Sequence, residues 1–462
     1  MADLTYDCII VGAGYSGLAA AKALVEHETK PRILVLEARE RIGGRAKTIH
    51  RDDGTYWDVG GSFLGKQQDL MYGLAREYNV EVFPIPQKGK LVFLHRGRAK
   101  EYSGLIPPLR PWEIIDSGIL LQKLEKKVRS VDVNAPWAHS KAKAWDSISI
   151  DEWVKRHSFT KGCRDMMDLG FQGVFGRSGG DISLLFAAFV FKTLGGVEAA
   201  FSSKDGLQQD MMVGGGMAIA KLIWEGIGGH EIVKLNEPVH QVKYDDSGCT
   251  ITSAKGEYCA KRVIFTVPPQ FAAKVQFEPS LPTEKQALLE AIELGVYAKV
   301  FATYATPFWR DRGLRGEATN LDGHLPIVFD ATSPGADSKG KLMAFLTGPK
   351  CREFAALSED ERRKIAIEEF AGLFGKEALE PDEFFYHSML HDSWSGGCPL
   401  ASPPPGIISS YGEWIRKPVG PIHWAGSETS TRMYGYMEGA VCAGQRAAKE
   451  VVEALTVEPG QS

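Results

Sequence analysis

The segment from Tyr6 to Glu37 reads YDCIIVGAGYSGLAAAKALVEHETKPRILVLE, and it decides the fold. It opens with an apolar, β-branched run at Cys8–Val11, continues through an Ala- and Leu-rich stretch at Leu18–Val25, and closes with a second apolar run at Ile33–Leu36. Short apolar runs of this kind are typical of buried parallel strands, and the middle stretch favours a helix. The order predicts a strand–helix–strand unit at the start of an α/β fold.

Three glycines at G-x-G-x-x-G spacing join the first predicted strand to the helix. Gly12 permits a tight turn, Gly14 lets the backbone approach a pyrophosphate, and Gly17 lets the helix pack closely on the strand. Unpaired N–H groups at a helix start attract phosphate, and Glu37, about 20 residues further on, can accept hydrogen bonds from a ribose. The unit predicts dinucleotide binding. The alternative is a glycine turn in some other α/β fold.

The bulk composition is that of an ordinary globular protein, and 462 residues allow about two or three domains. With 54 basic and 58 acidic residues the net charge is −4, so neither nucleic acid nor an anionic membrane surface is expected as a partner. The seven cysteines show no metal-binding or disulfide pattern, which favours a reducing setting and no metal. The chain start lacks a signal-peptide pattern, and the longest apolar run, Leu184–Phe191, is too short for a bilayer. We therefore expect a soluble, cytoplasmic protein.

Two more glycine pairs follow the first unit. Gly43 and Gly44 lie between arginines and can wrap backbone and positive charge around a phosphate. Gly60 and Gly61, followed by Ser62, mark another place where backbone must lie close to a ligand. A protein that binds only a nicotinamide dinucleotide needs neither segment, so together they favour the larger FAD.

The remaining sequence alternates between two kinds of segment, which differ in composition. Residues 80–201 are crowded with prolines and helical, charged stretches without a phosphate-binding signature, which favours a substrate-side domain. Strand-like pieces between residues 231 and 267 predict an antiparallel meander that returns to the first sheet. Later, a predicted strand at Val296–Thr303 carries Lys299, and Ser358 with Glu361 forms a capping box before a helix. A last strand precedes a long helix at Tyr436–Leu455.

A series of motifs along nearly the whole chain resembles one family. In order they are VGAGYSGLAAA, LEARERIGGR, WDVGGS, VGGG, EPV, TVPP, LGVYAK, PFWR, WSGGC, WAGSET and GYMEGAVCAG. The chain resembles the flavin-containing monoamine oxidases of the flavin amine oxidase superfamily. The resemblance implies a bilobal fold of mixed α/β (α+β) class, with a Rossmann-like FAD-binding domain made from residues 3–82, 212–286 and 393–457. A substrate-binding domain with a mixed sheet and helices would take residues 83–211 and 287–392, leaving 458–462 as a tail.

The resemblance also implies how FAD is held. The first glycine-rich turn would bind the pyrophosphate, Glu37 the adenosine ribose, and the adjacent arginines the adenosine and phosphates. Trp394 would border the isoalloxazine, and the last helix would point its positive N-terminus at the flavin pyrimidine. The implied FAD contacts are Gly12, Gly14, Ser16, Gly17, Glu37, Ala38, Arg39, Gly44, Arg45, Gly61, Ser62, Val239, Trp394, Cys398, Gly426, Glu428 and Met437.

Lys299, Tyr436 and Trp394 are the implied catalytic residues. Lys299 resembles the family's lysine that holds a water at flavin N5, and a lysine in an apolar strand is costly without such a task. The alternative is a lysine on a solvated strand edge. Cys398 lies where several monoamine oxidases form a thioether to the flavin 8α-methyl, which requires a thiolate. The alternative is a free cysteine packed beneath the flavin.

One residue departs from the family pattern at the substrate side. Pro399 stands where monoamine oxidases usually place one tyrosine of an aromatic cage, and Tyr436 matches the opposite wall. A half-missing cage leaves room for a bulkier or cyclic amine, unless another aromatic supplies the wall. The resemblance implies a mostly apolar substrate cavity with Phe201 as its gate; each member is otherwise an ordinary core residue. The implied cavity residues are Phe171, Val174, Phe175, Phe201, Gln208, Phe329 and Tyr436.

The implied activity is oxidative deamination of primary, and in some cases secondary, aliphatic, cyclic or aromatic amines. Hydride transfer to flavin N5 and reoxidation by O2 would give an aldehyde or ketone, ammonia and H2O2. Three alternatives stay open. A polyamine or diamine oxidase needs acidic residues at the cavity mouth, and an L-amino-acid oxidase needs an arginine near the flavin. A non-catalytic flavin-bearing protein would lack turnover. A homodimer is compatible with the resemblance.

Overall fold

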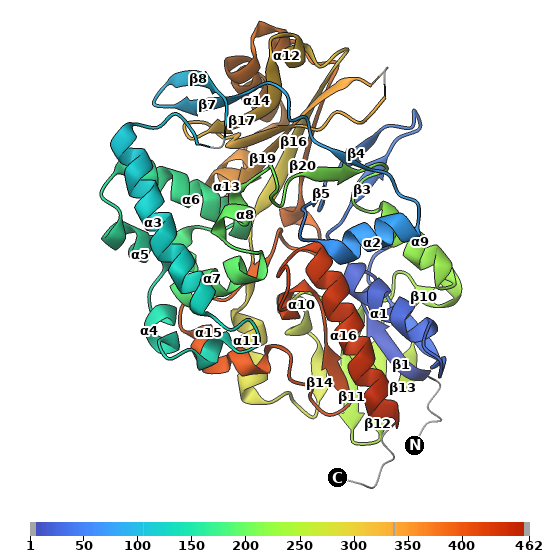
Figure 1. Ribbon diagram of the computed structural model, residues 1–462. Helices are drawn as coiled ribbons and strands as arrows, with labels where there is room; N and C mark the ends of the chain where they lie inside the picture. Colours follow the sequence, from blue (N-terminus) through green and yellow to red (C-terminus); the bar gives the residue numbers. More distant parts are fainter. Residues whose placement is uncertain (1–5, 105, 336–337, 457–462) are drawn as a thin grey trace.

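The structure, a computed structural model, describes residues 6–104, 106–335 and 338–456. Two sheets organise the chain (Figure 1), one in the lower right of the view around β1 and β13, the other at the top around β16 and β19. Helices α3 to α8 form a separate block at the left. The predicted mixed α/β class is confirmed. The predicted tail 458–462 lies outside the described residues, as do residues 3–5 and 457 of the predicted FAD-binding segments.

The first sheet has eight strands in the order β10-β2-β1-β13-β12-β11-β14, with β22 also pairing with β13. β1 runs parallel to both β2 and β13, and β22 is parallel to β13. The predicted meander is confirmed for β11, β12 and β13, which pair antiparallel in sequence, whereas the first predicted piece, β10, pairs parallel with β2 instead. The strands are β1 Tyr6–Val11, β2 Ile33–Leu36, β10 Val233–Lys234, β11 Val239–Asp245, β12 Gly248–Ser253, β13 Glu257–Phe265, β14 Gln276–Glu278 and β22 Ile422–Trp424.

Two long helices lie against this sheet. α1, Tyr15–Val25, packs along α16, Met437–Thr456 (Figure 1). The contact is so close that a Cβ on Gly444 would lie 2.1 Å from the backbone oxygen of Ser16. α2, Asp69–Glu77, and α9, Ala218–Gly226, complete this side. The expected last helix is therefore present, and its packing on α1 brings its N-terminal half to the start of α1 at the first glycine-rich turn.

The second sheet has seven strands in the order β20-β16-β19-β18-β17-β7-β8. It is mixed, since β17 pairs parallel with β7 while its other pairings are antiparallel. Lys299 lies on β16, directly opposite Phe345 of β19 and His387 of β20. The strands are β7 Lys90–His95, β8 Arg98–Tyr102, β16 Tyr297–Tyr304, β17 Leu314–Asn320, β18 Ile327–Asp330, β19 Gly340–Thr347 and β20 Glu383–Ser388.

The helical block has its own apolar core. The longest apolar run of the sequence is its central helix, α7, Leu184–Thr193, which is buried on all sides except at Lys192. Around α7 pack α3 Pro111–Ser130, α4 Ala142–Asp146, α5 Ile150–His157, α6 Lys161–Phe175 and α8 Val197–Phe201. The remaining helices are α10 Pro269–Ala272, α11 Thr283–Ala291, α12 Phe308–Asp311, α13 Gly348–Ala355, α14 Glu359–Phe374 and α15 Ile407–Tyr411.

Short strands connect these units: β3 Thr48–His50, β4 Tyr56–Asp58, β5 Phe63–Leu64, β6 Val82–Pro84, β9 Asp210–Met212, β15 Glu293–Leu294 and β21 Ala401–Ser402. The predicted capping box is present, with Ser358 and Glu361 satisfying each other's backbone N–H groups before α14. The strands of the eight-stranded sheet come from the three predicted FAD-binding segments, and those of the seven-stranded sheet from the two predicted substrate segments. The domain division itself stays a prediction.

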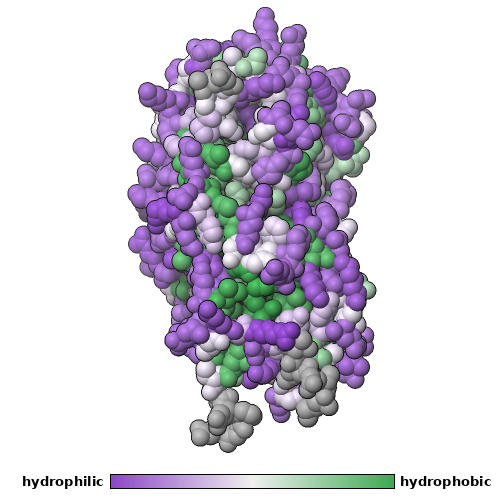
Figure 2. All heavy atoms as spheres, turned by 90° about the vertical axis from the view of Figure 1, so that its right-hand side faces the viewer, coloured by the Kyte–Doolittle hydropathy of each residue, from purple (hydrophilic) through white to green (hydrophobic). Residues whose placement is uncertain are grey.

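The surface differs between the two sides of the molecule. Figure 2 shows the side at the right of Figure 1, where hydrophilic residues cover most of the surface and hydrophobic ones gather in a band near its centre. On the opposite side, α3 exposes Trp112, Ile115 and Ile119 along one helix face. Across the described residues, no helix combines the length and the hydropathy that crossing a lipid bilayer requires.

Candidate functional site

One long cavity connects the two sheets. It begins at the carboxyl ends of β1 and β2, around Gly12, Gly14 and Glu37, which we call the glycine end. It reaches the start of β16, around Lys299, with Tyr297 and Tyr436, which we call the lysine end. Ligands of open α/β sheets bind outside the carboxyl ends of the strands, so the glycine end lies where the fold class places a nucleotide.

The glycine-rich turn has the geometry that the motif predicts. Gly12 adopts a φ of +104°, a conformation that favours glycine. Gly17 does not line the cavity, but a Cβ there would lie 1.9 Å from the Gly12 carbonyl oxygen, so only glycine lets α1 start here. No side chain caps the N-terminus of α1, which begins beside Gly14 and Ser16 in the cavity wall. No capping side chain therefore competes with an anionic ligand for its first N–H groups.

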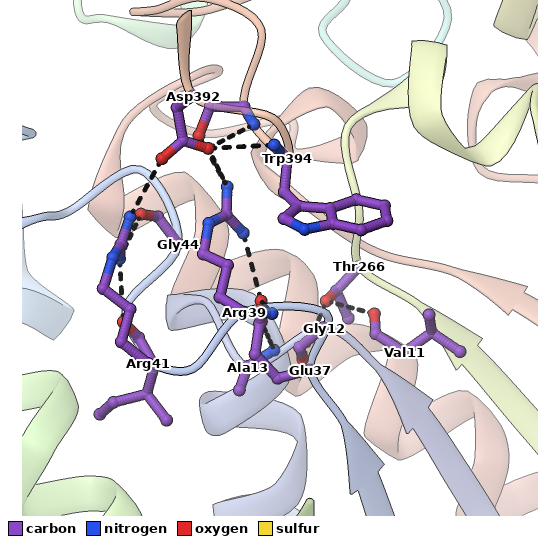
Figure 3. Close-up of polar contacts among 12 residues, drawn as sticks. Val11, Gly12, Ala13, Glu37, Arg39, Arg41, Gly44, Thr266, Asp392 and Trp394 are labelled. Carbon is purple, nitrogen blue, oxygen red and sulfur yellow. Dashed lines mark hydrogen bonds and ion pairs between the residues drawn. The ribbon is translucent and has the colours of Figure 1, made fainter. Parts of the chain in front are cut away.

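Glu37 is held by backbone at the same end (Figure 3). Its Oε2 accepts from the Ala13 N–H at 2.7 Å, and its Oε1 accepts from the Arg39 N–H at 3.0 Å. Arg39 in turn donates through Nη2 to Asp392 Oδ1 at 3.0 Å and to Ser395 Oγ at 2.7 Å. The Nε of Arg39 is buried and has no hydrogen-bond partner. A polar atom of this kind at the wall of a cavity fits a polar ligand group.

Asp392, which the sequence did not single out, orders the loop that carries Trp394. Its Oδ1 accepts from the backbone N–H groups of Trp394 at 3.1 Å and Ser395 at 2.8 Å (Figure 3). Burial alone would raise the pKa of this carboxyl, but the guanidinium of Arg39, these hydrogen bonds and Arg41 hold it below its usual range. The resulting ion pair joins the first and last parts of the chain across the glycine end, and Trp394 lines the cavity.

Arg45 and Glu428 form a two-pronged ion pair beside the cavity. Nη1 lies 2.6 Å from Oε1 and Nη2 lies 2.9 Å from Oε2. Burial alone would raise the pKa of the Glu428 carboxyl. The Arg45 charge and the hydrogen bonds have the larger, opposite effect and hold this pKa below its usual value. Arg45 also donates to Pro399 O at 3.0 Å and Ser427 Oγ at 2.9 Å. Arg45 lines the cavity, whereas Glu428 lies behind it and positions Arg45.

Lys299 is buried, not on a solvated edge: its residue is 4% exposed and its strand lies between two others. Its Nζ donates to Asp58 O at 2.7 Å, to Gly60 O at 2.6 Å and to Ser62 Oγ. Burial lowers the lysine pKa to about 8, against the opposing effect of the Asp58 charge. The glycine pair predicted to approach a ligand thus also holds the lysine.

The lysine end is walled by aromatic and apolar groups. Tyr297 packs edge-on to Phe345 with ring centroids 5.1 Å apart, and both line the cavity with Tyr436. Pro399 and Cys398 line the same end. Of the described residues that line the cavity, only Glu37 and Glu237 are acidic, and both lie at the glycine end, where the Glu237 N–H donates to Glu37 O. The lining arginines, Arg39 and Arg45, are each in ion pairs.

The structure separates the predicted substrate residues into two groups. Gln208 and Tyr436 line the cavity. Phe171, Val174 and Phe175 belong to the core of the helical block. Phe201 is 37% exposed, and its ring centroid lies 5.6 Å from that of Phe191. Phe329 lies behind the wall, with its ring against Phe63 and Phe345, which do line it.

The predicted cofactor residues gather more completely. All line the cavity except Gly17 and Glu428, which lie immediately behind it; the lining set is Gly12, Gly14, Ser16, Glu37, Ala38, Arg39, Gly44, Arg45, Gly61, Ser62, Val239, Trp394, Cys398, Gly426 and Met437. Sequence reasoning missed Tyr297 and Phe345. The strand alternation that places Tyr297 on the face of Lys299 was a usable signal. Phe345 comes from the neighbouring strand β19, and no signal in the sequence placed it at the cavity. No group of three potential metal ligands occurs among the described residues.

Comparisons with known proteins agree with this geometry. The family model for flavin containing amine oxidoreductase matches residues 15–452. The Mycobacterium tuberculosis protein AofH, provisionally named a flavin-containing monoamine oxidase, is 39% identical over 98% of this chain and 97% of its own.

Solved structures are similar as well. Cyclohexylamine oxidase from Brevibacterium oxydans IH-35A matches with a TM-score of 0.93 and 30% identity, covering 98% of this chain and all (100%) of that one. A putrescine oxidase bound to putrescine matches with a TM-score of 0.92 and 30% identity over 97% of this chain and 99% of that one. The chain therefore belongs to the family of flavin-containing amine oxidoreductases, and it is a flavin-dependent amine oxidase.

Proposed function

We propose that this enzyme is an FAD-dependent oxidase of primary monoamines, including cyclic and bulky ones. It would convert them with O2 to an aldehyde or ketone, ammonia and H2O2. The observation that carries the proposal is the composition of the cavity. It has a dinucleotide cradle at one end and a buried lysine among apolar walls at the other, and the described residues lining that other end include no carboxylate and no unpaired arginine.

The residues at the glycine end fit FAD. The uncapped start of α1 suits its pyrophosphate, Glu37 its ribose, and the unpartnered Nε of Arg39 a polar group of the same half. Gly61 and Met437 would lie along the flavin, since both line the stretch between the two ends. When bound, FAD supplies the acceptor for the hydride and passes the electrons on to O2.

The residues at the lysine end would bind and orient the amine. Tyr297, Phe345 and Tyr436 exclude water and disfavour the ammonium form, so the amine binds as the neutral base. Lys299 keeps a positive charge at this end below a pH of about 8, which stabilises negative charge that develops there. Among the described residues that line this end, no histidine or carboxylate is placed to act as a strong general base, which agrees with chemistry carried by the cofactor.

The proposed preference for monoamines follows from the charged groups that the lining of the lysine end lacks. A diamine such as putrescine carries a second ammonium that needs a carboxylate, and an amino acid carries a carboxylate that needs a free arginine. Neither is present among the described lining residues at the lysine end. Pro399 is smaller than the tyrosine of the family pattern, and Tyr297 supplies an aromatic wall instead. A cyclic monoamine, the substrate class named for the similar cyclohexylamine oxidase, suits this space.

We further propose that the flavin is not bound covalently. Cys398 lines the cavity, yet burial raises the pKa of its thiol, against the opposing charges of Arg45 and Lys299. Attack on the flavin methyl requires the thiolate, which a raised pKa disfavours. After acid precipitation the pellet should be colourless, with FAD in the supernatant; a yellow pellet would show a thioether.

The proposed function is tested by a peroxide assay across matched amines. Cyclohexylamine and benzylamine should give peroxide, whereas putrescine and L-leucine should give at least about tenfold less at equal concentration. Bleaching of the flavin absorption band by the same amines without oxygen would show that the difference between amines arises in the reductive half-reaction. Faster turnover of putrescine than of cyclohexylamine would contradict the proposed substrate class.

A further inference from the structure

A buried carboxylate lies next to the lysine, and no expectation from the sequence used it. Asp58 ends β4 and is 3% exposed. Its Oδ1 accepts from the Thr48 hydroxyl at 2.9 Å, and both carboxylate oxygens lie 3.0 Å from the Gly216 N–H. Its backbone oxygen accepts from Lys299 Nζ at 2.7 Å. One residue thus brings a buried acid and a buried base together.

The contacts of Lys299 match its charged form. An ammonium group has three donors, and the structure offers three acceptors, Asp58 O, Gly60 O and the Ser62 hydroxyl. A neutral amine has only two donors and would need the Ser62 hydroxyl to turn its proton toward the nitrogen, whereas this hydroxyl lies within hydrogen-bond distance of Asp58 O and Gly60 O as a donor. A buried charge of this kind is stable only with a compensating charge close by, because the interior solvates it poorly.

Asp58 is the group that can provide this charge. The titratable groups facing Lys299 from the neighbouring elements are His387 on β20, Cys398 in the last segment, Tyr297 on its own strand and Asp58 on β4. Burial lowers the pKa of His387 to about 4 and raises the pKa values of Cys398 and Tyr297, so these three are neutral at pH 7. Burial raises the pKa of Asp58 above its usual value as well, and the Lys299 charge and the hydrogen bonds donated by Gly216 and Thr48 oppose this rise by favouring the carboxylate.

A second lysine makes the position of Asp58 clearer. Lys341 on β19 lies opposite Thr303, further along the face of β16 that carries Lys299. Its Nζ donates to Tyr56 O at 2.9 Å and lies 5.1 Å from the Trp57 ring centroid. Burial lowers its pKa to about 8 as well, and Asp58 is again the first charge that opposes this. The segment Tyr56–Ser62 therefore lies across the sheet between a buried lysine and a partly buried one. The Asp58 carboxylate acts on both, and Asp53 and Glu383 add to its effect on Lys341.

We propose that Asp58 is a positioning residue that holds the charge of Lys299 through its carboxylate while it fixes the lysine in place through its carbonyl. The same carboxylate holds Gly216, whose backbone packs so tightly that a Cβ would lie 1.8 Å from Gly61 O. The charge of the lysine and the placement of the glycine pair along the cavity thus depend on one side chain. The inference deepens the proposed function, because it assumes that Lys299 acts at the flavin.

The first test is the pH dependence of flavin reoxidation by O2, with chemically reduced enzyme and no amine. For the wild type the rate should fall as the pH rises through about 8, where Lys299 loses its proton. Asp58→Asn keeps the size and removes the charge, so the fall should begin at lower pH. If the lysine pKa drops by about one unit, the charged fraction at pH 8 falls about fivefold. Thr48→Val removes one hydrogen bond to the same carboxylate and leaves the carboxyl group in place, so its midpoint should move much less than that of Asp58→Asn.

The second test does not depend on activity. Melting temperatures are measured for the wild type, Asp58→Asn, Lys299→Met and the double variant. Charge coupling predicts that Asp58→Asn lowers the melting temperature more when Lys299 is present than when methionine replaces it. If Asp58→Asn fails to fold while the double variant folds, the coupling is supported; if neither folds, the inference is overturned.

Equal losses in both backgrounds together with an unchanged pH midpoint would also overturn it, and would reduce Asp58 to a support for Gly216. If the two substitutions are coupled in the melting temperature but the enzyme oxidises no amine, the Asp58 inference is retained and the proposed function is contradicted instead.

Discussion

At the glycine end of the cavity backbone geometry determines the wall, whereas at the lysine end side chains from distant elements determine it. Gly12, Gly17 and Glu37 lie within one strand–helix–strand unit, and their roles follow from close approach and from hydrogen bonds to main-chain N–H groups. Tyr297, Phe345 and Tyr436 come from β16, β19 and the start of the last helix segment. One end therefore tolerates almost no change, and the other can be altered one contact at a time.

This difference separates retention of the cofactor from choice of substrate. Substitutions at the glycine end should remove flavin and stability together, because they displace backbone. Substitutions at the lysine end should leave a yellow, folded protein with changed kinetics. Five predictions test the separation, from the largest expected effect to the smallest.

The largest effect is expected for Gly17→Ala. The new Cβ would lie 1.9 Å from the Gly12 carbonyl oxygen, so the turn and the start of α1 would have to move. We expect colourless or unfolded protein, with a loss of more than about 4 kcal/mol in the free energy of unfolding. Flavin absorbance per protein and a thermal melt measure both. Gly73→Ala in α2 is the matched control, because no atom lies within 4 Å of its Cβ, and it should be neutral or slightly stabilising.

Arg45→Ala should cost about 3–5 kcal/mol of stability, because it leaves the Glu428 carboxylate buried without its partner. The double variant Arg45→Ala/Glu428→Gln should recover part of the loss. Equal melting temperatures for the single and double variants would contradict the role of the ion pair.

The same ion pair predicts an acid limit. The pKa of Glu428 is lower in the folded protein than its usual value of 4.5, so the pair contributes stability above pH 4.5 and loses it as the pH falls through the lowered value. A melt series from pH 6 to pH 3 should show this decline, and the double variant should show less of it.

Lys299→Met should retain flavin but slow turnover by about a hundredfold, the order expected for loss of one preorganised charged donor. Stopped-flow reduction and reoxidation would show which half-reaction slows. Lys341→Met removes a lysine from the same sheet face that does not line the cavity, and its turnover should be nearly unchanged. If Lys299→Met shows the wild-type rate in both half-reactions, the role of this lysine is refuted.

The smallest effect is expected for the aromatic side chains that line the lysine end of the cavity. Tyr297→Ala should lower kcat/KM for cyclohexylamine about tenfold, in line with ~1–3 kcal/mol of lost contact, while flavin content stays at the wild-type level. Phe201→Ala alters a partly exposed side chain outside the lining, so it should change mainly KM, and by less. If both variants lose flavin, the two ends of the cavity are not separable in the way proposed.

The sequence predicted the glycine end well because physical requirements there restrict the residue type. Only glycine fits at Gly17 beneath the Gly12 carbonyl, and an acid at the end of β2 can reach the Ala13 N–H. The strand order of the meander followed from alternation and turn residues, which act locally.

The lysine end was harder to predict because apolar side chains are interchangeable in sequence. Phe171 and Phe175 face the helical core, whereas Phe345 faces the cavity, and the difference depends on which strand pairs with β16. Asp58 and Asp392 escaped notice for a similar reason. An aspartate near a glycine pair is common in turns, and only the folded chain brings Lys299 and Arg39 to them.

The ion pair between Arg39 and Asp392 has a consequence for biogenesis. The two partners are separated by most of the polypeptide, and β22 and α16, which complete the first sheet and its helical cover, follow Asp392. A ribosome therefore delivers the closing parts of the flavin cradle last. Before these parts are made, the nascent chain lacks the cavity residues from Trp394 to Ala440, so stable capture of the cofactor awaits their synthesis rather than guiding it.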